Sequence, residues 1–92
     1  MPKYVIERDL PGLGLMSTEE MTATAAHSNE VLTGMAPAVQ WQHSYVTDDK
    51  MYCVYIAPDA EAVREHARRG GFPADAVNRI GRIIDPTTGE VG

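Results

Sequence analysis

Aromatic and β-branched residues gather in four runs along the chain, each bounded by residues that favour turns. Such runs are typical of β-strands, and they cover residues 3–8, 39–47, 51–57 and 78–84. Asp48, Asp49 and Lys50 separate the second run from the third, which is the pattern of a β-hairpin. The pattern therefore predicts four strands, of which the middle two pair through a tight turn.

The segment between the first two strands has the pattern of a helix. Ser17, followed three residues later by Glu20, forms a capping-box signature, in which each side chain accepts a free backbone N–H of the helix start. Gly34 and Pro37 are expected to end this helix. One weakly apolar stripe recurs along it at helical spacing and consists of Met21, Ala25, Ser28, Leu32 and Met35.

A second helix is predicted between the third and fourth strands. Pro58 fits its first turn, where a missing N–H is no loss, and Asp59 complements the positive end of the helix dipole. Arg68 and Arg69 complement the negative end, and the glycine pair at 70–71 should terminate the helix. A solvated helix face explains these arginines without an anionic ligand.

The order of these elements predicts an α+β fold of the ferredoxin-like βαββαβ type. This fold has a four-stranded antiparallel sheet with two helices on one face. A chain of 92 residues is long enough for one hydrophobic core, so residues 1–92 are predicted to form a single domain with a loose tail from about residue 86.

The register of the hairpin depends on the length of its loop, and the sequence leaves this open. A loop of two or four residues places one apolar set on a single face: Trp41, His43, Tyr45, Tyr52, Val54 and Ile56. A three-residue loop pairs the first three with Cys53 and Tyr55 instead. We expect the first register, with this face covered by the helices.

The other face of the sheet is then expected to be open and to carry Val5, Met51, Cys53 and Tyr55. Such a surface is too apolar to leave in water, and a short chain has no further element to cover it. A second copy of the chain is the simplest cover, because a two-fold axis presents the same residues from both subunits. The sequence therefore predicts a homodimer.

Composition limits the remaining partners. Eight basic against thirteen acidic residues give a net charge of -5, which repels nucleic acid. No stretch approaches the ~18 apolar residues of a membrane span, so no membrane partner is expected. The single Cys53 cannot form an internal disulfide, and the N-terminus lacks a signal-peptide pattern, which favours the cytoplasm.

Three residues are candidate metal ligands, namely His43, His66 and Glu7. His43 lies within a strand and should be at least partly buried, while His66 lies near the apolar stripe of the second helix and could meet His43 across a cleft. Two imidazoles are short of the usual four to six ligands, and a histidine satisfied by a neighbouring hydroxyl or carbonyl is the alternative for each. For Glu7 the alternative is an ion pair.

Four further residues are expected to line a pocket in that cleft: Trp41, Tyr45, Cys53 and Tyr55. Cys53 has no cation beside it in the sequence and no CxxC partner, so it should behave as a small buried apolar residue and not as a nucleophile.

The sequence resembles a family of small bacterial ferredoxin-like domains, one branch of which includes a dimeric, nickel-binding actinobacterial protein. The resemblance extends from the first strand to about Asp85 and is carried by three segments: Trp41-x-His43-Ser44-Tyr45-Val46, Cys53-Val54-Tyr55-x-Ala57-Pro58 and Arg64-Glu65-His66-Ala67. It implies the fold, a homodimer, and nickel or another divalent transition metal as cofactor. The nickel-binding branch has a Met-Asp-x-His stretch on its first strand, where this chain has residues 5–8, Val-Ile-Glu-Arg.

Three functions follow as hypotheses. The leading one is a non-catalytic domain that binds a small ligand or a transition metal such as nickel, and acts as a homodimer. The second is a small dimeric α+β barrel enzyme, with His43 as general base and Tyr45 or Tyr55 stabilising an oxyanion. The third is a structural or interaction domain whose cleft is filled by its own side chains. A pocket beside His43 would favour the enzyme, and clustered imidazoles would favour the metal.

Overall fold

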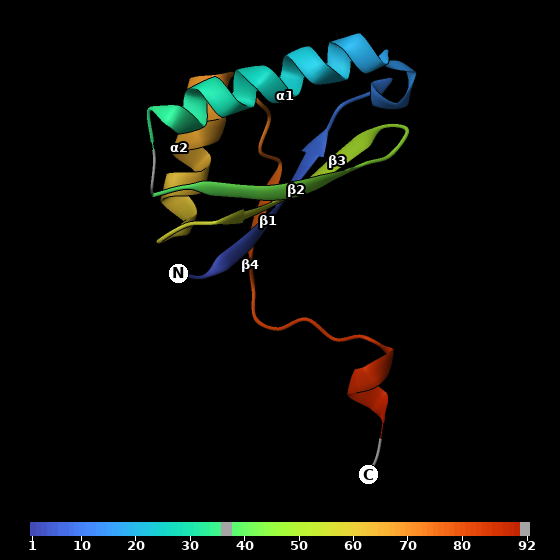
Figure 1. Ribbon diagram of the computed structural model, residues 1–92, viewed down its shortest axis with the longest axis vertical. Helices are drawn as coiled ribbons and strands as arrows, with labels where there is room; N and C mark the ends of the chain where they lie inside the picture. The colour runs from blue at the N-terminus through green and yellow to red at the C-terminus, as the bar shows by residue number, and fades with distance from the viewer. Residues whose placement is uncertain (36–37, 91–92) are drawn as a thin grey trace.

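The computed structural model describes residues 1–35 and 38–90, and these residues contain the predicted strands and helices in the predicted order. The bounds are β1 Lys3–Asp9, α1 Thr18–Thr33, β2 Gln40–Val46, β3 Lys50–Ile56, α2 Ala60–Gly70 and β4 Ala76–Ile80. All neighbouring strands are antiparallel, in the order β2-β3-β1-β4, and both helices lie on one face of the sheet (Figure 1). The ferredoxin-like α+β fold is therefore confirmed.

Helix α1 begins as the sequence predicts. The backbone N–H of Glu20 donates to Ser17 Oγ at 3.1 Å, and the backbone N–H of Ser17 donates to Glu20 Oε1 at 3.2 Å, so the capping box is complete. The helix ends at Thr33, directly before Gly34. Pro37, the other predicted terminator, lies outside the described residues.

Helix α2 begins slightly later than expected. Pro58 precedes the helix and does not lie in its first turn, because Asp59 is the N-cap and its Oδ1 accepts the backbone N–H of Ala62 at 2.8 Å. The predicted glycine stop is confirmed. Gly71 has a φ of 72°, a left-handed conformation that glycine adopts without steric cost.

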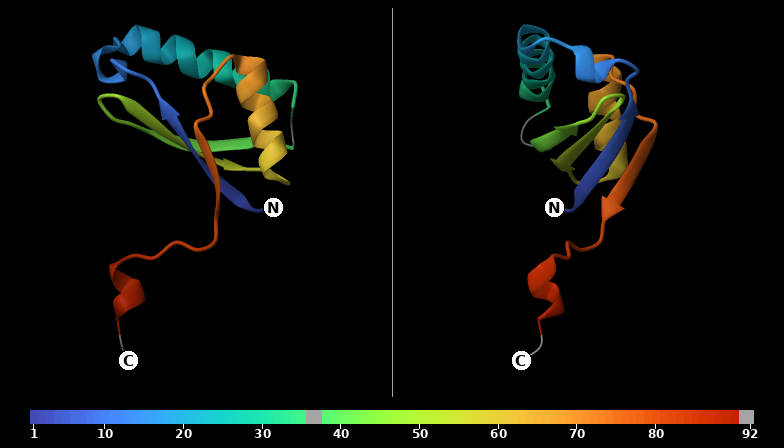
Figure 2. Two further views of the ribbon diagram at one scale, coloured as in Figure 1. Left: turned by 180° about the vertical axis from the view of Figure 1, so that it is seen from behind. Right: turned by 90° about the vertical axis from the view of Figure 1, so that its right-hand side faces the viewer.

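The last strand lies two residues earlier than predicted and is shorter. It spans 76–80 instead of 78–84, because β1, its partner in the described sheet, begins at Lys3, which already pairs with Ile80. Residues 81–85 leave the sheet, and a short 3-10 helix, η2 (Pro86–Gly89), follows them. Figures 1 and 2 show this tail running away from the body of the domain.

The hairpin has the expected register along most of its length. Val46 pairs with Met51, and the backbone N–H of Thr47 donates to the carbonyl of Lys50 at 2.9 Å, which leaves a two-residue loop of Asp48 and Asp49. His43 therefore lies opposite Val54, and Tyr45 opposite Tyr52. The prediction for these four residues is confirmed.

Trp41 departs from this register because of a β-bulge. It pairs with Tyr55, while His43 pairs with Val54, so Gln42 is an extra residue with no partner of its own. A bulge of this kind reverses the side of the sheet to which the preceding residue points. Trp41 consequently shares a face with Tyr55 and Ser44, and not with His43.

The helices cover the opposite face from the one expected. The buried residues Tyr4, Ile6, Cys53 and Tyr55 are at most 6% exposed and belong to the face beneath the helices, to which Met51 also belongs. The expected open placement of Met51, Cys53 and Tyr55 is wrong. Both alternating sets of β3 are apolar, so the alternation of that strand alone did not distinguish its two faces.

The face that stays open carries a different apolar set. It consists of Val5, Tyr45, Tyr52, Val54, Ile56 and Ile80, and we call this set the open face. Val5 lies here as predicted, since it pairs with Val54. Tyr45 is 60% exposed, and the other five are half-buried. The open face is therefore rich in apolar side chains although the helices do not reach it, and it shares this side of the sheet with Lys3, Glu7, His43 and Asn78.

The two helices contribute unequally to the core. Val63, His66 and Ala67 of α2 are fully or almost fully buried, whereas Ser28 is the single buried residue that α1 provides within its described span. Figure 2 shows α1 lying across the domain above the sheet. Neither helix of the described chain has the length and apolar character of a membrane span.

Candidate functional site

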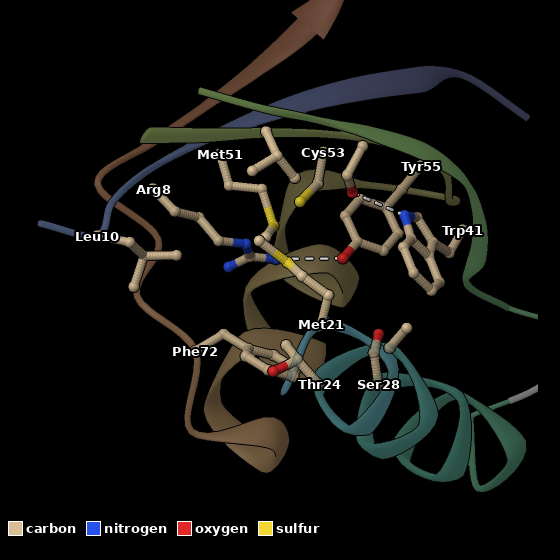
Figure 3. A pocket seen from close by; sticks show the side chains of 13 residues that line it. Arg8, Leu10, Met21, Thr24, Ser28, Trp41, Met51, Cys53, Tyr55 and Phe72 are labelled. Atoms are coloured by element: carbon tan, nitrogen blue, oxygen red, sulfur yellow. Dashed lines mark hydrogen bonds between the residues drawn. The ribbon is translucent and has the colours of Figure 1, made fainter. Parts of the chain in front are cut away.

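A cavity of about 240 Å³ lies between α1 and the covered face of the sheet. Its walls come from three places: Arg8, Trp41 and Tyr55 of the sheet, Met21 and Ser28 of α1, and Phe72 after α2 (Figure 3). Three members of the predicted stripe of α1, Met21, Ala25 and Ser28, line the cavity, and the last two of these are small. Leu32 packs against the core, as does Met35, which lies beyond the end of the helix. Small side chains do not reach the sheet, which leaves the cavity open.

Arg8 is the charged group of this cavity. It lies on the same side of β1 as Tyr4 and Ile6, and it is only 2% exposed. Its Nη1 donates to the carbonyl of Pro73, and its Nη2 donates to the hydroxyl of Tyr55 at 3.2 Å. The guanidinium carbon lies 5.4 Å from the centre of the Phe72 ring, within the range of a cation–π contact.

Tyr55 does not balance the charge of Arg8. Burial raises the pKa of Tyr55 to about 12, and the favourable effect of Arg8 on the phenolate only partly opposes this. The phenol is therefore neutral near pH 7. Among the described residues, no carboxylate lies within 4.0 Å of the Arg8 guanidinium. The basic residues that form ion pairs in this part of the chain are Lys50, Arg68 and Arg69.

The bulge in β2 positions the single tryptophan at the cavity. Trp41 Nε1 donates to Ser44 Oγ at 2.9 Å, an interaction that requires both side chains on the same side of the strand. Without the extra residue Gln42, positions 41 and 44 would point to opposite faces. Trp41 therefore reports directly on the contents of the cavity.

His66 is fully buried next to the cavity, at 0% exposure. Its Nε2 lies 3.3 Å from Ser28 Oγ, and its ring centre lies 5.3 Å from that of Tyr55 and 5.7 Å from that of Phe72. Burial lowers the pKa of His66, and the nearby charge of Arg8 lowers it further. Burial and the charge of Arg8 therefore keep the ring neutral, while a hydrogen bond to Ser28 opposes this. Nε2 has the hydroxyl partner of the alternative considered for this histidine, but the buried Nδ1 has no hydrogen-bond partner among the described residues.

His43 lies on the opposite side of the sheet from His66. It is exposed on the open face, and its ring is 5.1 Å from that of Tyr45 in an edge-to-face arrangement. The expected burial of His43, and its expected meeting with His66 in one cleft, are therefore wrong. The reason is the same as for the rest of β2: its odd positions 43 and 45 face away from the helices.

Glu7 also lies on the open side of the sheet. Its Oε1 accepts a hydrogen bond from Lys50 Nζ, which also lies 3.5 Å from Asp9 Oδ1. This ion pair is the alternative role considered for Glu7. In the described part of the chain, no three His, Cys, Asp or Glu residues are grouped so that they could hold a metal ion, so the three candidate ligands do not fit one nickel centre within a chain.

The predicted pocket corresponds to the cavity at three of its four positions. Trp41, Cys53 and Tyr55 line it, whereas Tyr45 lies on the open face. Since His43 is also on that face, His43 and Tyr55 cannot act on one substrate. The enzyme hypothesis keeps only its other pairing, that of His43 with Tyr45, whose rings lie 5.1 Å apart on the face away from the cavity. Sequence reasoning missed Arg8, although its alternation with Tyr4 and Ile6 along β1 was a visible signal.

The fold and the cavity define a small ferredoxin-like domain with a ligand-sized space under its first helix. The family model described as nickel responsive protein SCO4226-like matches residues 4–80, and the chain belongs to this family. Its structure is similar to the crystal structure of SCO4226 from Streptomyces coelicolor A3(2), with a TM-score of 0.74 and 16% identity over 89% of this chain and 99% of that chain. A comparison with curated proteins gave no match.

The buried, neutral His66 predicts a pH-dependent stability. Because its folded-state pKa lies below the ordinary 6.5, the unfolded chain binds the proton more readily, and the free energy of unfolding should fall as the pH drops through that range. The slope from this group is at most about 1.4 kcal/mol per pH unit. Urea titrations at pH 7.5 and 5.5 should show this loss, and His66→Gln should reduce it.

The matched control is His43→Gln, which changes an exposed histidine on the other face. Arg8, His27 and Tyr55 are the titratable groups around His66, and none of them is altered in either variant. An unchanged pH slope in His66→Gln would contradict the assignment of His66 as a buried neutral base.

Proposed function

We propose that this protein is a non-catalytic domain that binds a small ligand in the cavity beneath α1 and acts as a homodimer. The observation that carries the proposal is the cavity itself. An apolar space with a few convergent polar groups is the usual form of a small-molecule site. A cytoplasmic location is part of the proposal and is supported by the unpaired Cys53.

The cavity distinguishes this proposal from the structural alternative, in which side chains fill the cleft. A protein interior is close-packed, and voids much larger than a water molecule are few. A space of about 240 Å³ exceeds the ~150 Å³ of an apolar cavity that holds benzene. The half-exposed positions of Met21 and Thr24 along α1 offer a way in from the surface.

Filling the cavity from α1 should abolish ligand binding. Ala25→Leu adds a side chain to a cavity-lining position, whereas Ala26→Leu adds the same group on the exposed side of the same helix. Toluene, a neutral probe of suitable size, should change the fluorescence of Trp41 in the wild type and in Ala26→Leu but not in Ala25→Leu. An equal response in all three proteins would contradict the cavity as the binding site.

The homodimer is supported by the open face. Six apolar side chains lie together there, and no element of the described chain covers them. Ile83 and Ile84 in the tail are 71% and 72% exposed and add further apolar surface beyond the sheet. Burial of such surface by a second copy yields about 25 cal/mol for each Å² removed from water.

Light scattering at micromolar concentration should give about twice the chain mass of 10.0 kDa. Val54→Lys puts a charge at the centre of the open face and should produce a monomer, because burying an unpaired ammonium is costly. Ala26→Lys, which adds the same group on the exposed side of α1, should remain dimeric. A monomeric wild type would refute this part of the proposal.

Nickel enters the proposal through the family's description as nickel responsive. We expect only sub-stoichiometric metal in protein purified without chelator, and weak nickel or zinc uptake on addition, because His43, His66 and Glu7 are not grouped in one chain. His43→Ala should remove most of this uptake. His66→Ala should leave it unchanged, since that imidazole is buried and adjoins Ser28.

Elemental analysis measures the metal content of the purified protein, and calorimetric titration measures the uptake of added metal. Glu7→Ala should have little effect on this uptake, because Glu7 is paired with Lys50. Uptake that survives the combined change of His43 and His66 to alanine would refute His43 as the ligand.

A further inference from the structure

The cavity contains a positive charge without a counter-charge in the described chain. Arg8 is 2% exposed, and its partners are a carbonyl and a neutral phenol. Arginine is almost never fully buried unless it is paired, since the guanidinium loses its hydration when it leaves water. A buried arginine that lacks an acidic partner of its own therefore indicates that an anion from elsewhere completes the site.

The guanidinium is held in a fixed position with donors to spare. It has five N–H groups, and the contacts to Pro73 and Tyr55 use two of them. The ring of Phe72 lies against it, which restricts its movement further. Figure 3 shows Arg8 and Tyr55 joined at the sheet side of the cavity, with Thr24 and Ser28 of α1 opposite. The free donors suit the two oxygens of a carboxylate.

Tyr55 can supply another donor. Its oxygen already accepts from Arg8 Nη2, so its own hydrogen is available for an anion. The phenol keeps this hydrogen across the physiological range, because burial raises its pKa to about 12. The arrangement disfavours a metal cation, although Cys53, Met21 and Met51 bring sulfur atoms to the same cavity, because the charge of Arg8 would repel it.

The remainder of the lining is apolar, and it determines the size and polarity of the part of the ligand that does not contact Arg8. Leu10, Met21, Trp41 and Val46 contribute side chains without charge, and the volume of about 240 Å³ leaves room for a benzene ring and a short acidic chain. The chain carries a net charge of -5, so long-range attraction does not draw anions to it. Any selectivity for an anion must come from the local donors.

We infer that the cavity binds a small organic monocarboxylate with an apolar, ring-sized body, and that Arg8 determines this specificity by pairing with the carboxylate beside Tyr55. The inference rests on the proposed function, since it requires a ligand in the cavity. It goes beyond that proposal by naming the chemical class of the ligand and the residue that selects it.

The test compares 3-phenylpropionate with its neutral analogue 3-phenylpropanamide on the full-length chain. Binding is measured by Trp41 fluorescence and, independently, by the shift in the midpoint of thermal unfolding. The carboxylate should bind at least about tenfold more tightly than the amide, because hydrogen bonds to a charged partner are the strong ones. Arg8→Gln should remove this preference, and Tyr55→Phe should weaken carboxylate binding several-fold.

Arg8→Lys retains the charge but loses the planar fork, so it should bind the carboxylate more weakly than the wild type and still prefer it to the amide. Equal binding of the two compounds by the wild type would overturn the inference and leave the ligand cavity intact. Unchanged carboxylate preference in a folded Arg8→Gln would overturn it too. If neither compound nor toluene binds, the proposed function fails as well. The wild-type comparison decides the matter even if Arg8→Gln does not fold.

Discussion

The alternation of side chains along β1 is the constraint on which the rest of the structure depends. β1 is a central strand that pairs with both β3 and β4, so its two sides define the two faces of the sheet. Tyr4, Ile6 and Arg8 point beneath the helices, while Val5 and Glu7 point away. The face on which each paired residue of β3 and β4 lies then follows, because residues opposite each other in a sheet share a face.

Two consequences of the alternation along β1 matter for function. The pairing of β1 with β3 brings Cys53 and Tyr55 to the helix side, where Arg8 also lies, and the bulge at Gln42 turns Trp41 to the same side. These side chains surround a space that the small residues of α1 do not fill. The histidines are divided by the same sheet, with His66 beneath the helices and His43 on the open face.

Arg8 makes the cavity a compromise between stability and binding. An uncompensated buried charge costs several kcal/mol, and a cavity forgoes the dispersion contacts that close packing would supply. Replacing Arg8 by an apolar residue could give a better-packed core, whereas the present arrangement keeps a charged guanidinium in the wall of an empty space. Such features are expected where a protein is shaped for a ligand and not for maximal stability.

The elements and their order could be predicted from the sequence because local signals are strong there. The capping box at Ser17, the left-handed Gly71 and the two-residue hairpin loop each reflect the chemistry of a few adjacent residues. The family resemblance was likewise visible in short motifs of the second and third strands and the second helix, and the match to residues 4–80 confirms it.

The covered face and the end of the last strand depend instead on distant partners. Both sides of β3 are apolar, so its own pattern did not decide which one the helices cover. The bulge at Gln42 has no glycine or proline to mark it. β4 ends at Ile80 because its pairing partner β1 begins at Lys3. The sequence of residues 78–84 contains no signal for this end. The side of β1 on which Arg8 lies could be predicted from the alternation along that strand. Its lack of an acidic partner could be seen only in the folded structure.

The central claim is that the space beneath α1 is a binding site organised around Arg8. The chain has five methionines, and two of them, Met21 and Met51, line this space, whereas Met1 and Met35 do not. Methyl NMR of methionine-labelled protein with 3-phenylpropionate therefore locates the ligand directly. The account predicts intermolecular contacts between the ligand ring and the methyl groups of Met21 and Met51. Contacts to Met1 or Met35 without contacts to Met21 and Met51 would place the ligand elsewhere and contradict the account.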